Sequence, residues 1–121
     1  MYLIDTNMII YHFAGNMVAT DFFRANRGKL YISTMTVLEV LSFPASDQDI
    51  HHAERFLKDY FVWLDISQEI IFLSAKNRRS KKTKSPDAII GATALHHNLT
   101  IVTHNIRDFA HLPIAVFDPL I

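Results

Sequence analysis

Four acidic residues lie far apart in the sequence, yet each follows or begins a segment that would carry it to the same edge of one sheet. They are Asp5, Glu39, Asp87 and Asp108. Carboxylate oxygens are the ligands that hard divalent cations such as Mg²⁺ prefer. Neighbouring carboxylates repel one another, and a bound cation offsets that repulsion. We therefore interpret the four acids as a divalent-cation site, whose chemistry would suit hydrolysis of a phosphodiester bond.

The elements that would position these acids are short apolar runs that alternate with longer stretches of helical spacing. Strands are predicted at Tyr2–Ile4, Leu30–Ile32, Val62–Leu64, Ile101–Thr103 and Ala115–Phe117. Helices are predicted near Asn7–Ala14, Val18–Arg27, Thr36–Phe43, Asp49–Tyr60, Gln68–Arg79 and Pro86–Asn98. Such alternation predicts an α/β fold, with a mostly parallel central sheet of about five strands and helices on both faces.

The carboxyl ends of parallel strands meet at one edge of a sheet, where the following helices begin. Asp5 directly follows the first predicted strand, and Glu39 lies in the first turns of the helix after the second. Asp108 follows the fourth strand by a short link, and Asp87 opens the helix that leads back to that strand. In Ser85-Pro86, serine as N-cap and proline at the first helical position predict where this helix begins.

Each acid also has an ordinary structural explanation. Asp5 could cap a helix, Asp108 could be a turn residue, and Asp87 could favour the dipole of its helix. Thr36 with Glu39 matches the Thr-x-x-Glu capping box. None of these explanations accounts for four acids at one edge. They also leave Glu39 and Asp87 among apolar neighbours, where an unpaired carboxylate is unfavourable.

Four segments surround these acids with a recognisable pattern of neighbours. They are Leu3–Asn7, Ile32–Val40, Pro86–Ala94 and Ile101–Phe109. In this order and at these spacings, the chain resembles PIN domains, and within that superfamily the VapC toxins of prokaryotic toxin–antitoxin pairs. The resemblance runs essentially end to end. It implies a single PIN domain over residues 1–121, with a PIN-like three-layer sandwich fold.

The resemblance implies an endoribonuclease, a hydrolase that depends on Mg²⁺ or Mn²⁺. The acidic quartet of the family, which carries metal binding and catalysis, corresponds to Asp5, Glu39, Asp87 and Asp108. Thr6 and Asn105 match polar positions that support the quartet by hydrogen bonding. His104 stands where an arginine is frequent, so a phosphate contact at this place would be weaker or sensitive to pH. The implied partners are an RNA substrate, an antitoxin protein and a second copy in a homodimer.

A basic run, Lys76–Lys84, holds half of the chain's 12 lysines and arginines and no acid. The net charge of the chain is zero, but attraction of a polyanion depends on the local potential. A solvated helix end is the ordinary explanation of such a run. Because the run leads directly to Asp87, we predict that it binds RNA phosphates. The predicted RNA-binding residues are Arg78, Arg79, Lys81, Lys82 and Lys84.

Composition limits the other possibilities. Cysteine is absent, which excludes disulfides, thiolate metal ligands and cysteine catalysis, and is compatible with a reducing cytosol. No export signal or membrane segment is visible, so a cytoplasmic location without a membrane partner is expected. The histidine pairs His51-His52 and His96-His97 consist of adjacent residues, which point in different directions on a helix and are expected at the surface.

Four other classes of protein offer alternatives to this interpretation. A receiver-like Mg²⁺-binding signalling domain would also gather acids at strand ends, but it needs a lysine near the last strands, and none follows Lys84. A haloacid-dehalogenase-like phosphohydrolase would have an aspartate where Asn7 stands. A PIN-fold RNA-binding or processing factor outside a toxin–antitoxin pair remains an alternative. A purely scaffolding member would have lost acids, and all four are present.

Overall fold

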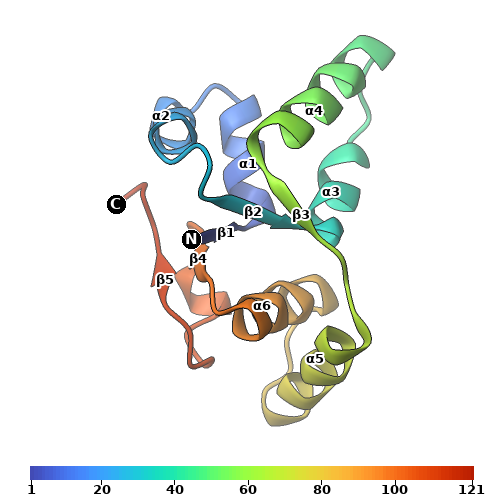
Figure 1. The fold of residues 1–121 in the computed structure, drawn as a ribbon, viewed down its shortest axis with the longest axis vertical. Helices are drawn as coiled ribbons and strands as arrows, with labels where there is room; N and C mark the ends of the chain where they lie inside the picture. Colours follow the sequence, from blue (N-terminus) through green and yellow to red (C-terminus); the bar gives the residue numbers. More distant parts are fainter.

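The computed structural model of the protein describes residues 1–121 as a central sheet with helices on both faces (Figure 1). The strands are β1 (Tyr2–Ile4), β2 (Leu30–Ser33), β3 (Val62–Leu64), β4 (Thr100–Val102) and β5 (Val116–Phe117). Their order across the sheet is β3-β2-β1-β4-β5, and every neighbouring pair is parallel. The predicted α/β fold with a parallel five-stranded sheet is therefore confirmed.

Six α-helices connect or follow the strands, as the sequence predicts. They are α1 (Thr6–Phe13), α2 (Met17–Ala25), α3 (Thr34–Leu41), α4 (Asp47–Tyr60), α5 (Gln68–Ser80) and α6 (Ser85–His97). A short 3-10 helix, η1 (Ile106–Asp108), follows β4. None of these helices combines the length and the apolar composition that crossing a bilayer requires.

Five of the six helices begin one or two residues earlier than predicted, and for α3 and α6 the caps explain the difference. Ser33 caps α3 by accepting a hydrogen bond from the Met35 N–H at 3.0 Å, so Thr36 lies inside the helix and forms no capping box. The N-cap of α6 is Lys84 rather than Ser85, because the Lys84 carbonyl already accepts a hydrogen bond from the Ala88 N–H at 3.0 Å. Both helices consequently begin earlier than predicted.

The helices form one layer on each face of the sheet. In Figure 1, α1 to α4 lie on one side of the sheet and α5 and α6 on the other. The larger core cluster, on the first side, includes Ile4, Phe23 and Leu57, and the smaller one on the other side includes Leu3 and Ile90. Adjacent residues of β1 thus enter opposite layers, as the alternation of side chains along a strand requires. Both faces of the central strands are therefore buried.

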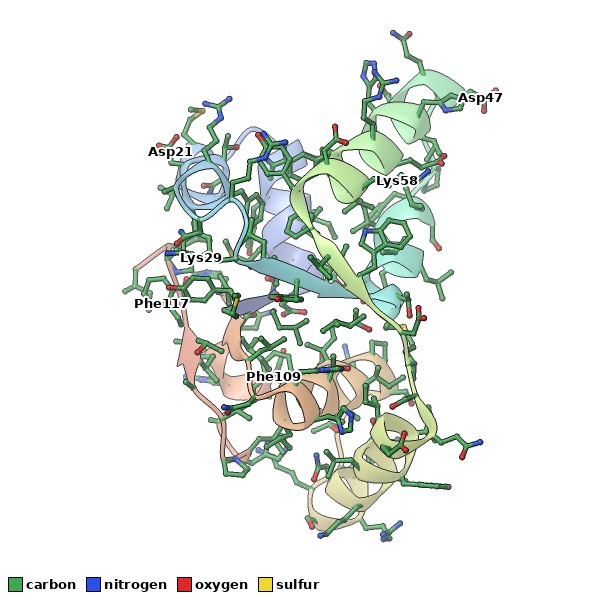
Figure 2. The ribbon with its side chains drawn as sticks, viewed as in Figure 1. Asp21, Lys29, Asp47, Lys58, Phe109 and Phe117 are labelled. Carbon is green, nitrogen blue, oxygen red and sulfur yellow. The ribbon has the colours of Figure 1, made fainter.

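The smaller layer fixes the chain segment that follows β4. Phe109 is fully buried in this layer, whereas charged side chains such as Asp21 and Lys58 project outward from their helices (Figure 2). A Cβ atom at Gly91 would meet the side chain of Leu112 and would lie 3.7 Å from the Phe109 ring. Gly91 therefore lets the segment after η1 pack directly on α6.

Candidate functional site

Asp5 lies at the point where the connections of the sheet change direction. The residue follows β1, which pairs with β2 on one side and with β4 on the other. Ligands of parallel sheets bind at such a switch point, outside the carboxyl ends of the strands. Asp5 is also the N-cap of α1, because its Oδ1 accepts a hydrogen bond from the Thr6 N–H at 2.8 Å. The capping role and a ligand role are compatible, since each carboxylate oxygen has two lone pairs.

Thr103 holds the second oxygen of Asp5. It follows β4 directly, and the pairing of Ile4 with Val102 sets it opposite Asp5. Its hydroxyl donates a hydrogen bond to Asp5 Oδ2 at 2.8 Å and accepts one from the Asn105 N–H at 3.0 Å. The backbone N–H of Asn105, rather than its side-chain amide, therefore makes this contact. Sequence analysis missed Thr103, although a polar residue at the carboxyl end of a buried strand was a signal for it.

Thr6 connects Asp5 to Glu39. The Thr6 hydroxyl donates a hydrogen bond to Glu39 Oε1 at 2.7 Å and lies 3.1 Å from the Thr36 hydroxyl. Thr36 and Glu39 share one face of α3, since they are three residues apart on the helix. The hydrogen bonds of Thr6 thus join the N-terminus of α1 to the middle of α3. As a result, Glu39 is held beside the end of β1.

Asp87 and Asp108 approach the same edge from the other layer. Asp87 lies in the first turn of α6, one turn before Gly91 on the same face of the helix. Phe109 packs close to Gly91, so its neighbour Asp108, an exposed residue at the end of η1, lies near Asp87. Burial raises the pKa of Asp87, the charges of Asp108 and Glu39 raise it further, and Lys84 lowers it. Asp87 is therefore close enough to interact electrostatically with Asp5, Glu39 and Asp108.

Asp5 carries an unbalanced buried charge. Burial raises its pKa from the usual 3.8 to about 6, hydrogen bonds from Thr103 and Thr6 oppose that change, and the charges of Asp87 and Glu39 add to it. No lysine, arginine or histidine lies within ion-pair distance of any of the four acids; the one contact of that kind in the protein joins His104 to Asp118. No ion pair within the chain therefore balances the negative charge of these acids, although Lys84 acts on Asp87 from a longer distance.

The donor chemistry of this site fits a hard divalent cation. Its side chains offer only oxygen ligands, the type that Mg²⁺ and Mn²⁺ prefer. Asn7, next to Thr6 at the start of α1, adds a buried side-chain oxygen that has no hydrogen-bond partner. As the side chains stand, however, no three acids converge closely enough to hold one ion directly. Because Mg²⁺ usually keeps several waters as ligands, one or two direct carboxylate contacts with water-mediated contacts to the others would suffice.

A basic cleft lies beside these acids, and Lys81, Lys82 and Lys84 line it together with Asp87. Its volume is about 260 Å³, and Thr83, Arg107 and Asp108 complete its lining. Sequence analysis missed Arg107, although its place next to Asp108 was a signal for it.

Two predicted RNA-binding residues, Arg78 and Arg79, do not line this cleft. They occupy the last turn of α5. Arg78 supports the loop before α6, because its Nε donates a hydrogen bond to the Thr83 carbonyl at 2.9 Å.

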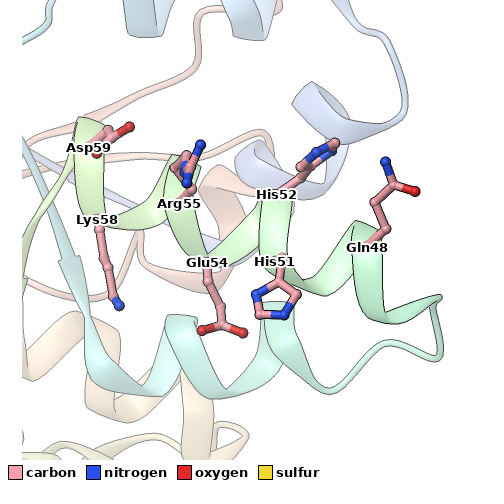
Figure 3. A pocket seen from close by; sticks show the side chains of 7 residues that line it. All are labelled: Gln48, His51, His52, Glu54, Arg55, Lys58 and Asp59. Carbon is pink, nitrogen blue, oxygen red and sulfur yellow. The ribbon is translucent and has the colours of Figure 1, made fainter.

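A larger hollow, of about 730 Å³, lies along α4 and has a different character. All of its lining residues belong to that one helix, and they carry charges of both signs. Figure 3 shows that His52 and Arg55 point to one side of the helix, while His51 and Glu54 point to the other. These side chains do not converge on a common ligand. The opposed directions of His51 and His52 agree with the surface positions predicted for the histidine pairs.

Comparison with known proteins identifies the family. The family described as PIN domain matches residues 2–115 of the chain. Among solved structures, a toxin–antitoxin complex from Klebsiella pneumoniae contains a chain with 36% sequence identity and a TM-score of 0.81, and the match covers 98% of both chains. The chain therefore belongs to the PIN domain family, and its predicted resemblance to VapC-type toxins is confirmed.

More distant structures share the fold. DNA-bound VapBC from Salmonella typhimurium has a TM-score of 0.84 at 22% identity, covering 98% of this chain and 97% of that one. FitAcB from Neisseria gonorrhoeae has a TM-score of 0.81 at 23% identity, covering 99% of both. A comparison with curated protein sequences gives no match.

The raised pKa of Asp5 predicts how the metal-free protein responds to pH. A folded-state pKa of about 6, above the usual 3.8, means that the folded protein binds this proton more tightly than the unfolded chain. The resulting stabilisation is fully present below pH 3.8 and is lost as the pH rises to about 6. Above that pH, ionised Asp5 lowers the free energy of unfolding by roughly 3 kcal/mol, at 1.36 kcal/mol per pKa unit.

Asp5→Asn should therefore raise the free energy of unfolding by about 1 to 3 kcal/mol at pH 8 in a chelator, and by much less near pH 4. Urea unfolding of both proteins at the two pH values measures this difference. Asp21→Asn, a change on the outside of α2, is the matched control and should have no such effect. An equal difference between wild type and Asp5→Asn at both pH values would contradict the assigned cause.

Proposed function

We propose that this protein is a metal-dependent endoribonuclease and the toxin of a toxin–antitoxin pair. The observation that carries the proposal is the buried, uncompensated carboxylate of Asp5 among three further acids at the switch point of the sheet. Membership of the PIN domain family supports a nuclease. The 36% identical relative comes from a toxin–antitoxin complex, which supports the toxin role. The cytoplasmic location expected from the sequence belongs to this proposal.

In the proposed reaction, the acids hold one or two divalent cations, Mg²⁺ or Mn²⁺. When bound, such an ion supplies a Lewis acid that polarises a phosphoryl oxygen and activates water for attack on phosphorus. Asp5 and Asp87 are the proposed main ligands, with Asp108 next. Thr103 and the Thr6 N–H fix the direction of the Asp5 carboxylate, because each donates to a different oxygen. Glu39, held by Thr6, either ligates or orients the attacking water.

The substrate in this proposal is RNA, bound by its phosphates in the basic cleft. Lys81, Lys82 and Lys84 are exposed and share the lining of the cleft with Asp87 and Asp108. Positive charge at this place would draw the polyanion to the acids, and would offset the repulsion between phosphate and carboxylate. Arg79, in the last turn of α5, would contribute a weaker contact at longer range, and Arg78 mainly supports the loop.

An apolar groove is the proposed binding site of the antitoxin. The groove has a volume of about 540 Å³ and lies between α1, α3 and α4, with Ile10, Phe13, Val40 and Phe43 among its lining residues. Phe13 and Phe43 are 46% and 55% exposed. Large apolar side chains that are exposed side by side are typical of a surface that binds a partner. Phe13 ends α1, and Asp5 lies just before its first residue. The helix has 8 residues, so its two ends are about 12 Å apart. A segment in the groove can therefore reach the acids.

A homodimer is also part of the proposal. Phe72 on α5 is 70% exposed and lies outside the groove, as does its neighbour Ile71. A second apolar surface on α5 would remain available after the antitoxin is bound. The alternative, an RNA-processing factor outside a toxin–antitoxin pair, keeps the same acids and the same cleft. In this alternative, no antitoxin would bind the apolar groove.

Removing a proposed ligand tests the metal mechanism. Asp5→Asn and Asp87→Asn should each fold and should lower the rate of Mg²⁺-dependent RNA cleavage by roughly 100-fold or more, since the loss of even supporting groups of metal ligands costs about 10- to 100-fold. Cleavage of a labelled single-stranded RNA with and without Mg²⁺ is the measurement. Asp21→Asn is the control for the loss of a negative charge. Full activity in either folded variant would remove the proposed mechanism.

The basic cleft predicts a specific salt dependence. The double change Lys81→Gln with Lys82→Gln should weaken RNA binding and lower the slope of log K against log salt concentration by about 0.7 for each phosphate that the protein no longer neutralises. Fluorescence anisotropy of a labelled RNA between low and high salt measures both quantities. Arg55→Gln with Lys58→Gln removes the same charge from α4 and should change neither. If the cleft variant kept the wild-type affinity and slope, the basic run would be only a solvated surface.

The groove predicts how the antitoxin inhibits. We expect its segment to place an arginine or lysine among Asp5, Glu39, Asp87 and Asp108, where the side chain replaces the charge of the metal. Inhibition of the purified complex, with the partner encoded by the neighbouring gene, should weaken as Mg²⁺ is raised. Phe43→Glu should weaken partner binding while leaving cleavage by the free protein intact. Inhibition that depends neither on Mg²⁺ nor on Phe43 would contradict this part of the proposal alone.

A further inference from the structure

His104 and Asp118 form a pair next to the acids that the mechanism above does not use. His104 comes directly after Thr103 at the end of β4, and Asp118 comes directly after β5. Because β4 and β5 are parallel and Val102 pairs with Phe117, the two residues leave the sheet side by side. His104 Nδ1 lies 2.9 Å from Asp118 Oδ2. The contact is a hydrogen bond when the imidazole is neutral and becomes an ion pair only when it is protonated.

Two contacts orient the imidazole, and a third fixes the Asp118 carboxylate that it meets. The Asp118 side chain is only 2% exposed, and its Oδ1 accepts a hydrogen bond from the Leu120 N–H at 2.9 Å. The carboxylate therefore cannot turn away from His104. The ring of Tyr11 packs against the imidazole edge to face, with the ring centres 5.8 Å apart. The His104 side chain is nevertheless 45% exposed, so one side of the ring faces solvent.

The hydrogen-bond partner fixes the tautomer. An ionised carboxylate can only accept hydrogen bonds, so the hydrogen of the neutral imidazole lies on Nδ1, and Nε2 has a free lone pair. A free acceptor cannot bind a phosphate, whose oxygens are also acceptors. It can accept a hydrogen bond from a hydroxyl group. Every nucleotide of RNA carries such a donor in its 2′-hydroxyl, and DNA lacks it.

His104 lines a cleft that continues from the active site. The cleft has a volume of about 650 Å³, within the range of about 300 to 1,000 Å³ that is common for ligand sites. Arg107 and Asp108 belong to the lining of this cleft and also to that of the basic cleft beside Asp87. The two clefts therefore meet at Asp108. An RNA strand bound in the basic cleft and passing the acids would enter the cleft of His104 next.

We propose that His104, oriented by Asp118, accepts a hydrogen bond from the 2′-hydroxyl of the nucleotide beyond Asp108 and so selects RNA over DNA. This inference rests on the proposed function, because it assumes that the strand passes the acids. Asp118 is a positioning residue, and His104 is a specificity-determining one. An arginine at position 104 would have only donors and could not make this contact.

A comparison of two ligands with and without the imidazole tests the inference. The ligands are a short fluorescent oligouridylate and the oligodeoxyuridylate of equal length, which differ only in the 2′-hydroxyls. Their affinities are measured by anisotropy in a chelator at pH 8, where no metal-dependent cleavage occurs. Wild type should bind the ribose form roughly three- to tenfold more tightly, the gain expected of one hydrogen bond. His104→Ala should lose this preference and bind the deoxyribose form as wild type does.

Further variants separate the contact from a change in folding. His104→Gln keeps an acceptor and should retain part of the preference, whereas His104→Arg should lose it. Asp118→Asn leaves the imidazole free to change its tautomer, so the preference should shrink. His51→Ala, on the outer face of α4 (Figure 3), is the matched histidine control and should behave as wild type. Circular dichroism and thermal unfolding of each variant confirm that it is folded.

The outcomes distinguish this inference from the proposed function. An equal preference for ribose in wild type and His104→Ala would overturn the inference. The inference would also be overturned if His104→Ala bound both ligands more weakly and its affinity depended less steeply on salt concentration. That result would indicate a phosphate contact. In either case, RNA cleavage by wild type with Mg²⁺ would leave the proposed function intact. If wild type neither bound nor cleaved RNA, both would fall.

Discussion

The structure of the site depends on one unfavourable feature, the burial of the Asp5 carboxylate between β1 and β4. Ionised Asp5 is held by two hydrogen bonds, but these do not offset its removal from water and the charges of Asp87 and Glu39. A folded chain of this size has only about 5 to 15 kcal/mol of net stability, so one such group uses a large part of it. Two buried apolar layers supply the stability that allows this arrangement to persist. The charge is kept where a cation or a basic side chain can be bound.

The two layers contribute different surfaces to this edge. The layer of α1 to α4 provides Glu39 and an apolar groove, and the layer of α5 and α6 provides Asp87 and the basic cleft. A protein segment and a nucleic acid would therefore approach the acids from different sides. Competition between them would occur only at the acids themselves. In this way a small domain can serve both as an enzyme and as the target of an inhibitor.

The sequence predicted the sheet and the six helices, because these depend on the apolar period, and it placed the four acids at one edge by the rule that the carboxyl ends of parallel strands meet there. It did not predict the caps of α3 and α6, since Ser33 and Lys84 are recognisable as caps only from the backbone path. Thr103 escaped notice because its partner Asp5 is 98 residues away. Arg107 was missed because the cleft that it lines forms only when the segment after η1 packs on α6. Contacts between distant segments of the chain thus account for most of what was not predicted.

The hydrogen bonds of Thr103 have a consequence for how the site would bind an ion. Its hydroxyl has one hydrogen, given to Asp5, and accepts from the Asn105 N–H, with the amide of Asn7 at a longer 3.4 Å. Asp5 is therefore ordered before any ligand arrives, and binding through it costs little conformational entropy. Asp108, exposed at the end of η1, has no comparable restraint. The site thus joins a rigid half, which would set the position of a bound ion, to an adjustable half, which could close around ions and substrates of different size.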